Sequence, residues 1–401
     1  MRANARDIAR LINDPEVLEV VEDAAYSPAV LDSMPLIGAA DDGSMAGYTG
    51  AGQTIAILDT GVDKDHPMLL GKVVSEACYS TSSTRYGVYS LCPDAATSST
   101  AIDSARPCDS DLWGSGCDHG THVAGIAAGD DGIHFGAARD AQVIAIQVYS
   151  GFTASACGGT PCVMAYTSDI IKGLERVQAL RELYAISAAN LSLGGGSYTE
   201  PCDSDPTKPA IDSLRAAGVA TVVASGNSGY VNALAAPACV SSAISVGATC
   251  DDGGVYCATQ DAVADYSNSA EFLSLLAPGS LITSSVPGGD YASWHGTSMA
   301  APHVAGTWAV LKEAYPTAGW DAVPDATGYR LDVSLRSDFR RLVRVHDDLD
   351  VGAATSQTVS NLRPDRTYYV RVRAYNAASI SLSSTPQSVS TGSVTFSSRR
   401  R

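Results

Sequence analysis

The sequence predicts an α/β protein, in which a parallel sheet has helices on both faces and a small all-β sandwich follows. Apolar runs that suit buried strands, such as residues 54–58 and 219–224, alternate with helical periodicity, as in residues 170–180. Strands that alternate with helices form parallel sheets covered on both sides. Beyond residue 316 the pattern changes, because residues 329–333 and 368–374 alternate with the period of a half-exposed antiparallel strand.

The expected elements of the sheet are short, and most of them end at a polar or glycine-rich turn. Residues 54–58 run directly into Asp59, and residues 219–224 lead into the turn Gly-Asn-Ser-Gly at 226–229. Pro278 is expected to stop the last apolar run. The other expected strands are residues 143–148, 185–193, 244–246 and 273–277, and the expected helices are residues 170–180 and 211–217.

Several polar or small residues fall where such a sheet places its functional sites. Sites of open parallel sheets form at the carboxyl ends of the strands, and Asp59, Gly194 and Asn227 all lie at such ends. A second feature is the stretch Gly296-Thr-Ser-Met-Ala-Ala-Pro-His-Val-Ala-Gly306, in which Pro302 suits a first helical turn. We therefore expect Ser298 at a helix N-terminus, where free N–H groups favour developing negative charge.

Composition divides the chain into an acidic part and a basic part. The 401 residues carry a net charge of −17, which argues against nucleic acid or an anionic membrane as a partner. Residues 319–401 contain 12 basic and 8 acidic residues, whereas the rest of the chain contains 14 basic and 35 acidic residues. The length and this shift predict a large domain followed by a smaller one, with a boundary near residue 319.

Ten cysteines indicate an oxidising compartment. Cys157 with Cys162 and Cys250 with Cys257 lie close together in loop-like sequence, which favours up to five disulfides over ten buried free thiols. No pair has the C-x-x-C spacing of a metal site, so no metal ligand is predicted. No apolar run reaches transmembrane length, and no signal peptide is visible after Met1. A secreted form would therefore need an export signal that this chain does not show.

Three residues at the ends of elements have the side chains of a hydrolytic triad. Asp59 ends a strand, while His119 and Ser298 each begin a run of small residues typical of a helix. Alone, each is more often a cap, a structural residue or a turn residue. Together, the order Asp, His, Ser along the chain is the order of subtilisin.

The chain resembles the subtilisin family (subtilases) of serine proteases over about residues 51–315. Five segments carry the resemblance, and they occur in the family's order and spacing. They are Asp59-Thr-Gly-Val-Asp63, His119-Gly-Thr-His-Val-Ala-Gly125, Ser192-Leu-Gly-Gly195, Ala224-Ser-Gly-Asn227 and Gly296-Thr-Ser-Met-Ala-Ala-Pro302.

The resemblance implies a role for each of these segments. Ser298 would be the nucleophile, His119 its general base, and Asp59 the group that orients the imidazole. The Asn227 amide and the Ser298 backbone N–H would hold the oxyanion. His122 and His303 are interpreted as packed helix residues. The segments that would bind an extended peptide and wall its pocket consist of Ser192, Leu193, Gly194, Gly195, Ala224, Ser225 and Gly226. Because these walls are small and uncharged, we expect a preference for sizeable apolar residues before the cut.

The flanking segments resemble two other modules. The motif Asn13-Asp-Pro-Glu-Val-Leu18 is typical of the second half of the subtilase inhibitory propeptide. The C-terminal part resembles a fibronectin type III module that lacks its first strand, with Trp320 as its core tryptophan and Tyr368 as its corner tyrosine. The predicted organisation is a partial propeptide, a linker, a peptidase domain, an incomplete fibronectin type III-like module and a tail, at residues 1–26, 27–50, 51–318, 319–393 and 394–401.

These features together predict a secreted serine endopeptidase that works through an acyl-enzyme. Its partners would be protein or peptide substrates and its own propeptide, without nucleic acid or membrane, and we expect a monomer. The chemistry needs no cofactor. The resemblance also implies structural calcium, but Met68 stands where an aspartate is expected after His66-Pro67, so no ligand is assigned. Two alternatives stay open, namely an inactive binding or adhesion protein on the same scaffold and a truncated inactive form.

Overall fold

A computed structural model of the chain describes most of the predicted peptidase and β parts. The expected propeptide segment and Trp320 lie outside the described residues, so those predictions stay open. Within the described ranges, no helix is both long and apolar enough to cross a membrane. The described residues are 33–34, 36–38, 47–250, 256–257, 259–315, 317–319, 323, 326–360, 362–363, 366–377 and 379–391.

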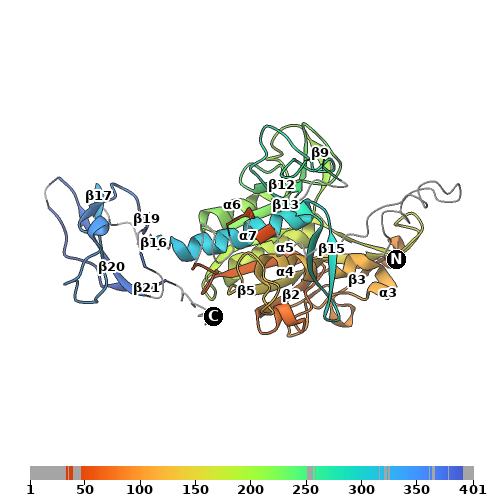
Figure 1. Cartoon of the computed structure of the whole chain (residues 1–401), viewed down its shortest axis with the longest axis horizontal. Coiled ribbons are helices and arrows are strands. Elements are labelled where there is room, and N and C mark those ends of the chain that lie inside the picture. Colours follow the sequence, from red (N-terminus) through yellow and green to blue (C-terminus); the bar gives the residue numbers. More distant parts are fainter. Residues whose placement is uncertain are drawn as a thin grey trace, which may run out of the picture.

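An eight-stranded sheet forms the centre of the larger part (Figure 1), and it confirms the predicted fold class. The strand order is β13-β12-β10-β8-β1-β5-β2-β4, and every neighbouring pair is parallel except β2 with β4. The strands are β1 (Thr54–Asp59), β2 (Val73–Tyr79), β4 (Ser98–Ser99), β5 (Gln142–Gln147), β8 (Ile186–Leu191), β10 (Ala220–Ala224), β12 (Ile244–Cys250) and β13 (Leu275–Ser280).

Helices cover both faces of this sheet, as the apolar runs predict. In β1, Ile55 and Ile57 face a core shared with α4 and α7, whereas Ala56 and Leu58 face a core shared with α5 and α6. A strand with apolar side chains on both faces can only be stable in such a covered position. The four helices are α4 (His119–Ala128), α5 (Thr167–Leu180), α6 (Lys208–Ala216) and α7 (Thr297–Ala314).

Short elements complete the larger part around its loops. Small antiparallel sheets pair β3 with β6 and β7, β9 with β11, and β14 with β15. Their bounds are β3 (Val88–Ser90), β6 (Tyr149–Phe152), β7 (Cys162–Ala165), β9 (Gly195–Tyr198), β11 (Leu234–Ala236), β14 (Ile282–Val286) and β15 (Asp290–Trp294). The short helices are α3 (Ser110–Trp113), η1 (Pro67–Leu69), η2 (Thr84–Tyr86), η3 (Pro93–Ala95) and η4 (Ser115–Asp118).

The ten cysteines form five disulfides, which confirms the expected pairing of all of them. Each bridge closes a short or moderate loop, with sequence separations from 5 to 37 residues. The pairs are Cys78–Cys92, Cys108–Cys117, Cys157–Cys162, Cys202–Cys239 and Cys250–Cys257.

Two details of the larger part differ from the sequence expectations. Pro278 does not end an apolar run but lies inside β13, which the sheet tolerates because β13 is an edge strand. Within the segment expected as a linker, Met34 is fully buried in the α4/α7 core. Ser33 bonds to His303 of α7 through its hydroxyl, 2.9 Å from the ring Nε2. Composition alone did not indicate this docking.

The C-terminal part is an antiparallel β structure, as its period of two predicts. Its four-stranded sheet has the order β18-β17-β20-β21, and β16 pairs with β19. The Tyr368 hydroxyl accepts the Arg363 backbone N–H at 2.7 Å, as a corner tyrosine does. A three-residue strand, β16, precedes β17. The elements are β16 (Thr317–Gly319), β17 (Gly328–Ser334), η5 (Arg344–His346), β18 (Leu349–Asp350), β19 (Ser356–Thr358), β20 (Thr367–Tyr375) and β21 (Gln387–Ser390).

Candidate active site

A cleft of about 810 Å³ lies at the carboxyl ends of β8 and β10, beside the first turns of α4 and α7. Most of the predicted site residues line it. Asp59 and Ser225 do not, because both are completely buried behind its wall. The predicted residues that line the cleft are His119, Ser192, Leu193, Gly194, Gly195, Ala224, Gly226, Asn227 and Ser298.

Asp59, which is fully buried, pairs with His119, which is partly exposed to the cleft. Asp59 Oδ1 lies 2.7 Å from His119 Nδ1 and also accepts the Thr60 backbone N–H at 2.7 Å. Burial disfavours charge on the imidazole, but the negative charge and hydrogen bond of Asp59 outweigh it and raise the pKa of His119. Asp59 therefore favours the tautomer with its proton on Nδ1, which leaves Nε2 free to accept one.

The close approach of the two elements depends on Gly120. A Cβ atom at this position would lie 2.3 Å from the Gly61 carbonyl oxygen and 3.0 Å from the Asp59 Cβ, so a larger residue would push α4 away from β1. The Thr60 hydroxyl accepts the Gly120 backbone N–H at 3.0 Å, which ties the start of α4 to the end of β1. This contact explains why a glycine follows His119 directly.

Ser298 lies in the first turn of α7, as the sequence predicts. Its hydroxyl donates to the Ser192 carbonyl at 3.2 Å. Among the described residues, no hydrogen bond joins it to His119, an arrangement common in substrate-free sites, where the contact tightens on binding. The Ser298 backbone N–H has no acceptor among the described residues either, so it can serve as a donor to a ligand.

Pro302 lies in the second turn of α7, so its expected place in the first turn was wrong. Inside a helix, a proline leaves the carbonyl four residues earlier without its N–H partner. Here that carbonyl belongs to Ser298, and the Ser192 hydroxyl donates to it at 2.7 Å. Because of Pro302, the Ser298 carbonyl can accept a hydrogen bond from the Ser192 hydroxyl. The Ser298 hydroxyl in turn donates to the Ser192 carbonyl, so two hydrogen bonds join Ser192 to α7.

Asn227 is oriented by the N-terminus of α7. Its Oδ1 accepts both the backbone N–H and the hydroxyl of Thr297, each at 2.9 Å. The amide nitrogen makes no hydrogen bond with another described residue, so its donors are free beside Ser298. Gly226 allows this placement, because its φ of 107° is accessible to glycine and a Cβ there would lie 2.3 Å from Asn268 Nδ2. Two free N–H donors thus stand in the cleft, as an oxyanion site requires.

The predicted peptide-binding strand has a free edge. The backbone groups of Leu193 and Gly194 make no hydrogen bond with another described residue. The next residue, Gly195, pairs with Ala236 of β11. An extended peptide can therefore add beside residues 192–194. Three larger side chains that sequence reasoning did not identify extend the apolar lining, namely Tyr149, Met164 and Ile170.

The cleft also contains a carboxylate that no motif indicated. Asp205 is the single acidic residue among the described residues that line it. The Oδ1 atom of Asp205 accepts hydrogen bonds from the backbone N–H of Thr207 at 2.9 Å and from the Thr207 hydroxyl at 2.6 Å, just before α6 begins. The disulfide between Cys202 and Cys239 holds this loop against the segment after β11. Only the folded chain brings Asp205 to the cleft, so no local pattern could have identified it.

Comparison with known proteins agrees with this geometry. Residues 50–330 match the subtilase family of peptidases (S8). The chain belongs to the subtilase family. It is 31 % identical to subtilisin E of Bacillus subtilis (strain 168) over 322 residues, which covers 77 % of this chain and 69 % of that protein. It is 33 % identical to an alkaline protease of Alkalihalobacillus alcalophilus over 316 residues, covering 78 % and 68 %.

Structural comparison supports the same assignment. The solved structure of sphericase has 27 % identity to this subtilase and a TM-score of 0.52, and the match covers 70 % of this chain and 83 % of that one. Residues 317–390 match the fibronectin type III domain. The protein is therefore a subtilisin-like serine endopeptidase that carries a fibronectin type III module.

Two further histidines of the subtilase are buried and neutral. Burial lowers the pKa of His122 to about 3 and that of His303 to about 4. The His122 ring bonds to the Ala292 carbonyl at 2.9 Å, and the His303 ring bonds to the Met299 carbonyl at 2.8 Å. These contacts support their interpretation as packed residues. Among the described residues, no group of three or more His, Cys, Asp or Glu could hold a metal ion.

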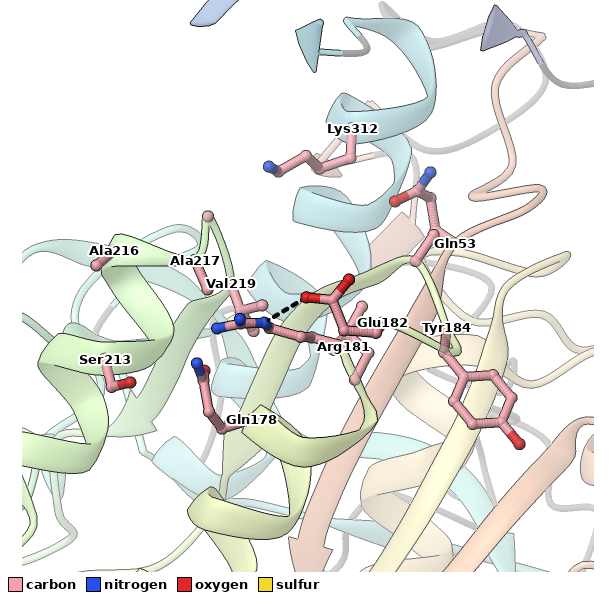
Figure 2. Close-up of a pocket in the computed structure, with 13 residues that line it drawn as sticks. Gln53, Gln178, Arg181, Glu182, Tyr184, Ser213, Ala216, Ala217, Val219 and Lys312 are labelled. Carbon is pink, nitrogen blue, oxygen red and sulfur yellow. Dashed lines mark hydrogen bonds and ion pairs between the residues drawn. The ribbon is translucent and has the colours of Figure 1, made fainter. Parts of the chain in front are cut away.

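A second hollow lies away from the cleft that contains Ser298, at the amino ends of the strands (Figure 2). Its volume is about 680 Å³, and its wall includes Gln53 before β1 and Val219 before β10. Arg181 Nε pairs with Glu182 Oε1 at 3.0 Å across its middle. Ligand sites of open parallel sheets form at the other edge, so this hollow is not assigned to the peptidase reaction.

Proposed function

We propose that this subtilase is a secreted endopeptidase that cleaves peptide bonds through an acyl-enzyme on Ser298, with His119 and Asp59 as the rest of its triad. The observation that carries the proposal is that Asp59 lies 2.7 Å from His119, which lines a cleft together with Ser298 and N–H donors that no described residue accepts. An inactive scaffold protein would be free to lose any of these groups, and all of them are present.

The proposed reaction begins with a substrate strand beside residues 192–194. Ser298 Oγ attacks the scissile carbonyl carbon, and its proton passes to His119 Nε2. The carbonyl oxygen gains negative charge, which the Ser298 backbone N–H and the Asn227 amide stabilise. Asp59 stabilises the imidazolium that forms, because its carboxylate stays bonded to Nδ1.

Collapse of this intermediate breaks the C–N bond. His119 gives its proton to the leaving amine, and the acyl group remains on Ser298 Oγ. A water molecule then attacks the acyl carbon with His119 again as the base, which releases the acid product and restores the serine. These steps need no metal or redox cofactor, and we assign no calcium ligand.

The apolar lining supports a preference for apolar side chains before the cut, and five disulfides support an extracellular location. The proposed partners are protein or peptide substrates and the chain's own propeptide, and the proposed state is a monomer. Mass spectrometry that found free thiols in active extracellular protein would contradict the role of the disulfides.

Labelling with a fluorophosphonate tests the proposal directly, because the reagent phosphonylates an activated serine and loses fluoride. The parent should be labelled at one site and should cleave a denatured protein, whereas Ser298→Ala should lose both properties and keep its fold. His119→Ala should lose labelling as well. A parent that folds but neither reacts nor cleaves would refute the proposal in favour of a binding scaffold.

A further inference from the structure

We propose that the fibronectin type III module binds an acidic polysaccharide through an arginine patch, which consists of Arg336, Arg340, Arg341 and Arg344. All four side chains are exposed, and they lie within nine consecutive residues after β17. The module stands beyond the C-terminal end of α7 in Figure 1 (blue), so a ligand bound there would leave the catalytic cleft open.

The described residues of the module neutralise only part of the charge on this patch. Asp338 is the single described carboxylate in reach, 3.0 Å from Arg336 and 3.9 Å from Arg340. Arg341 and Arg344 form no ion pair with any described residue. The patch therefore carries about three uncompensated positive charges.

The other described arginines of the sheet behave differently. Arg330, Arg371 and Arg373 pair with Asp348 or Asp332 at 2.8, 2.9 and 2.7 Å. These arginine charges are therefore neutralised by ion pairs within the sheet. The contrast indicates that the arginine patch has another partner, because the same module neutralises arginines where they have a structural role.

The backbone beneath the patch is held in one shape. The Leu335 N–H donates to the Arg341 carbonyl at 3.0 Å, and the Val343 N–H donates to the Val333 carbonyl at 2.8 Å. Phe339 is 8 % exposed and lies under the Arg371 guanidinium, 4.2 Å from its ring centroid. A loop fixed in this way loses little backbone entropy when a ligand binds.

The residue type points to carboxylate or sulfate groups. All 12 basic residues of positions 319–401 are arginine, and none is lysine. The planar guanidinium binds carboxylates and sulfates through two parallel hydrogen bonds, which the ammonium of lysine cannot do. Several arginines on one loop match a polymer that repeats an anionic group, and five disulfides favour a polymer found outside cells.

Two other polyanions fit the patch less well. Binding to single-stranded nucleic acid relies on exposed aromatic rings, and the one aromatic residue of the loop, Phe339, is buried. Binding to a membrane surface relies on a face of exposed apolar side chains, and Val345, 52 % exposed, is isolated beside the loop. A polysaccharide needs neither feature.

Retention on immobilised heparin, a sulfated and carboxylated polysaccharide, tests the proposal with the full chain. The test variant is Arg341→Gln/Arg344→Gln, and the control of equal charge is Arg85→Gln/Arg215→Gln, which alters two exposed arginines of the peptidase domain. The test variant should elute at a lower NaCl concentration. Its plot of log affinity against log salt concentration should be shallower by roughly 1.4–1.8, because two fewer counterions are released when it binds. The control should elute with the parent.

Activity on a short uncharged peptide and thermal unfolding should be unchanged in both variants. Arg340→Gln is a second test that cannot disturb packing, because this side chain is 84 % exposed, and it should shift elution in the same direction. Three results would each overturn the proposal. They are a parent that heparin does not retain at 50 mM NaCl, an equal loss in the control, and tighter patch-dependent binding to single-stranded DNA or anionic vesicles than to heparin.

Discussion

Replacing Asn227 by aspartate separates the two roles that the structure gives this side chain. Oδ1 holds the first residue of α7, Thr297, through two hydrogen bonds of 2.9 Å, and the amide nitrogen has no hydrogen-bond partner among the described residues. Asn227→Asp keeps the acceptor and removes the donor. Asn227→Ala removes both, so the two variants should differ in stability, and both should lose catalysis.

The stability difference follows from the two bonds to Thr297. Each typical hydrogen bond contributes about 0.5–1.5 kcal/mol, so Asn227→Ala should lower the free energy of unfolding by roughly 1–3 kcal/mol. Asn227→Asp should stay close to the parent, since a carboxylate accepts both bonds and favours a helix N-terminus. Turnover should fall about 10²–10³-fold in Asn227→Ala, the factor known for the corresponding amide of subtilisin, and at least as much in Asn227→Asp, whose negative charge also repels the oxyanion.

Two measurements on each variant check this reasoning. Denaturant unfolding of the forms labelled at Ser298, or of variants combined with Ser298→Ala to prevent self-digestion, gives the stability difference. Steady-state kinetics on a peptide substrate gives kcat and KM. Near-normal kcat in Asn227→Asp would refute the oxyanion role, and equal stability of the alanine and aspartate variants would refute the role of Oδ1 in holding α7.

Three further predictions concern the Asp59–His119 pair, Glu313 of helix α7, and the N-terminal segment that contains Ser33. Asp59 raises the pKa of His119 above its ordinary value of 6.5, so kcat/KM should fall as the pH falls through a midpoint above 6.5. Asp59→Asn should lower that midpoint, and an unchanged midpoint would contradict the pairing of Asp59 with His119. Glu313 accepts hydrogen bonds from the backbone N–H groups of residues 49–51. Glu313→Ala should therefore lower the free energy of unfolding by roughly 3–5 kcal/mol, and Glu313→Gln should lower it much less. Denaturant unfolding of both variants checks this. N-terminal sequencing of secreted protein should place any maturation cut before Ser33, because that residue is bonded to α7; a mature chain that starts later would refute the docking.

The residues of the proposed triad could be identified because their signals are local. Asp59 follows an apolar run, and His119 and Ser298 precede runs of small residues that pack closely, so each position is visible within about ten residues of sequence. The fold class was predictable for the same reason, since it depends on periodicity within each element. Asp205 was not, because a long loop and the Cys202–Cys239 disulfide bring it to the cleft from outside any motif.

The place of Pro302 was mispredicted because position in a helix depends on where the helix begins. The propensity of proline for the first turn is a general tendency, and here the helix begins at Thr297, one turn earlier. The cost of an internal proline is a carbonyl without its partner. A sequence pattern cannot reveal that the hydroxyl of Ser192, which follows β8 more than a hundred residues earlier in the chain, supplies the missing donor.

Helix α7 shows how such tertiary contacts would support the proposed reaction. Its first turn carries Ser298, and the carbonyl freed by Pro302 bonds that turn to the peptide-binding strand. Further along, His303 bonds to Ser33, and near the C-terminal end Glu313 binds three N–H groups of the chain just before β1. The helix that carries the proposed nucleophile is thus held along its length by Ser192, Ser33 and residues 49–51. A serine hydroxyl and an imidazole must meet within about 3 Å for proton transfer, and a helix fixed at one end only would let that distance vary.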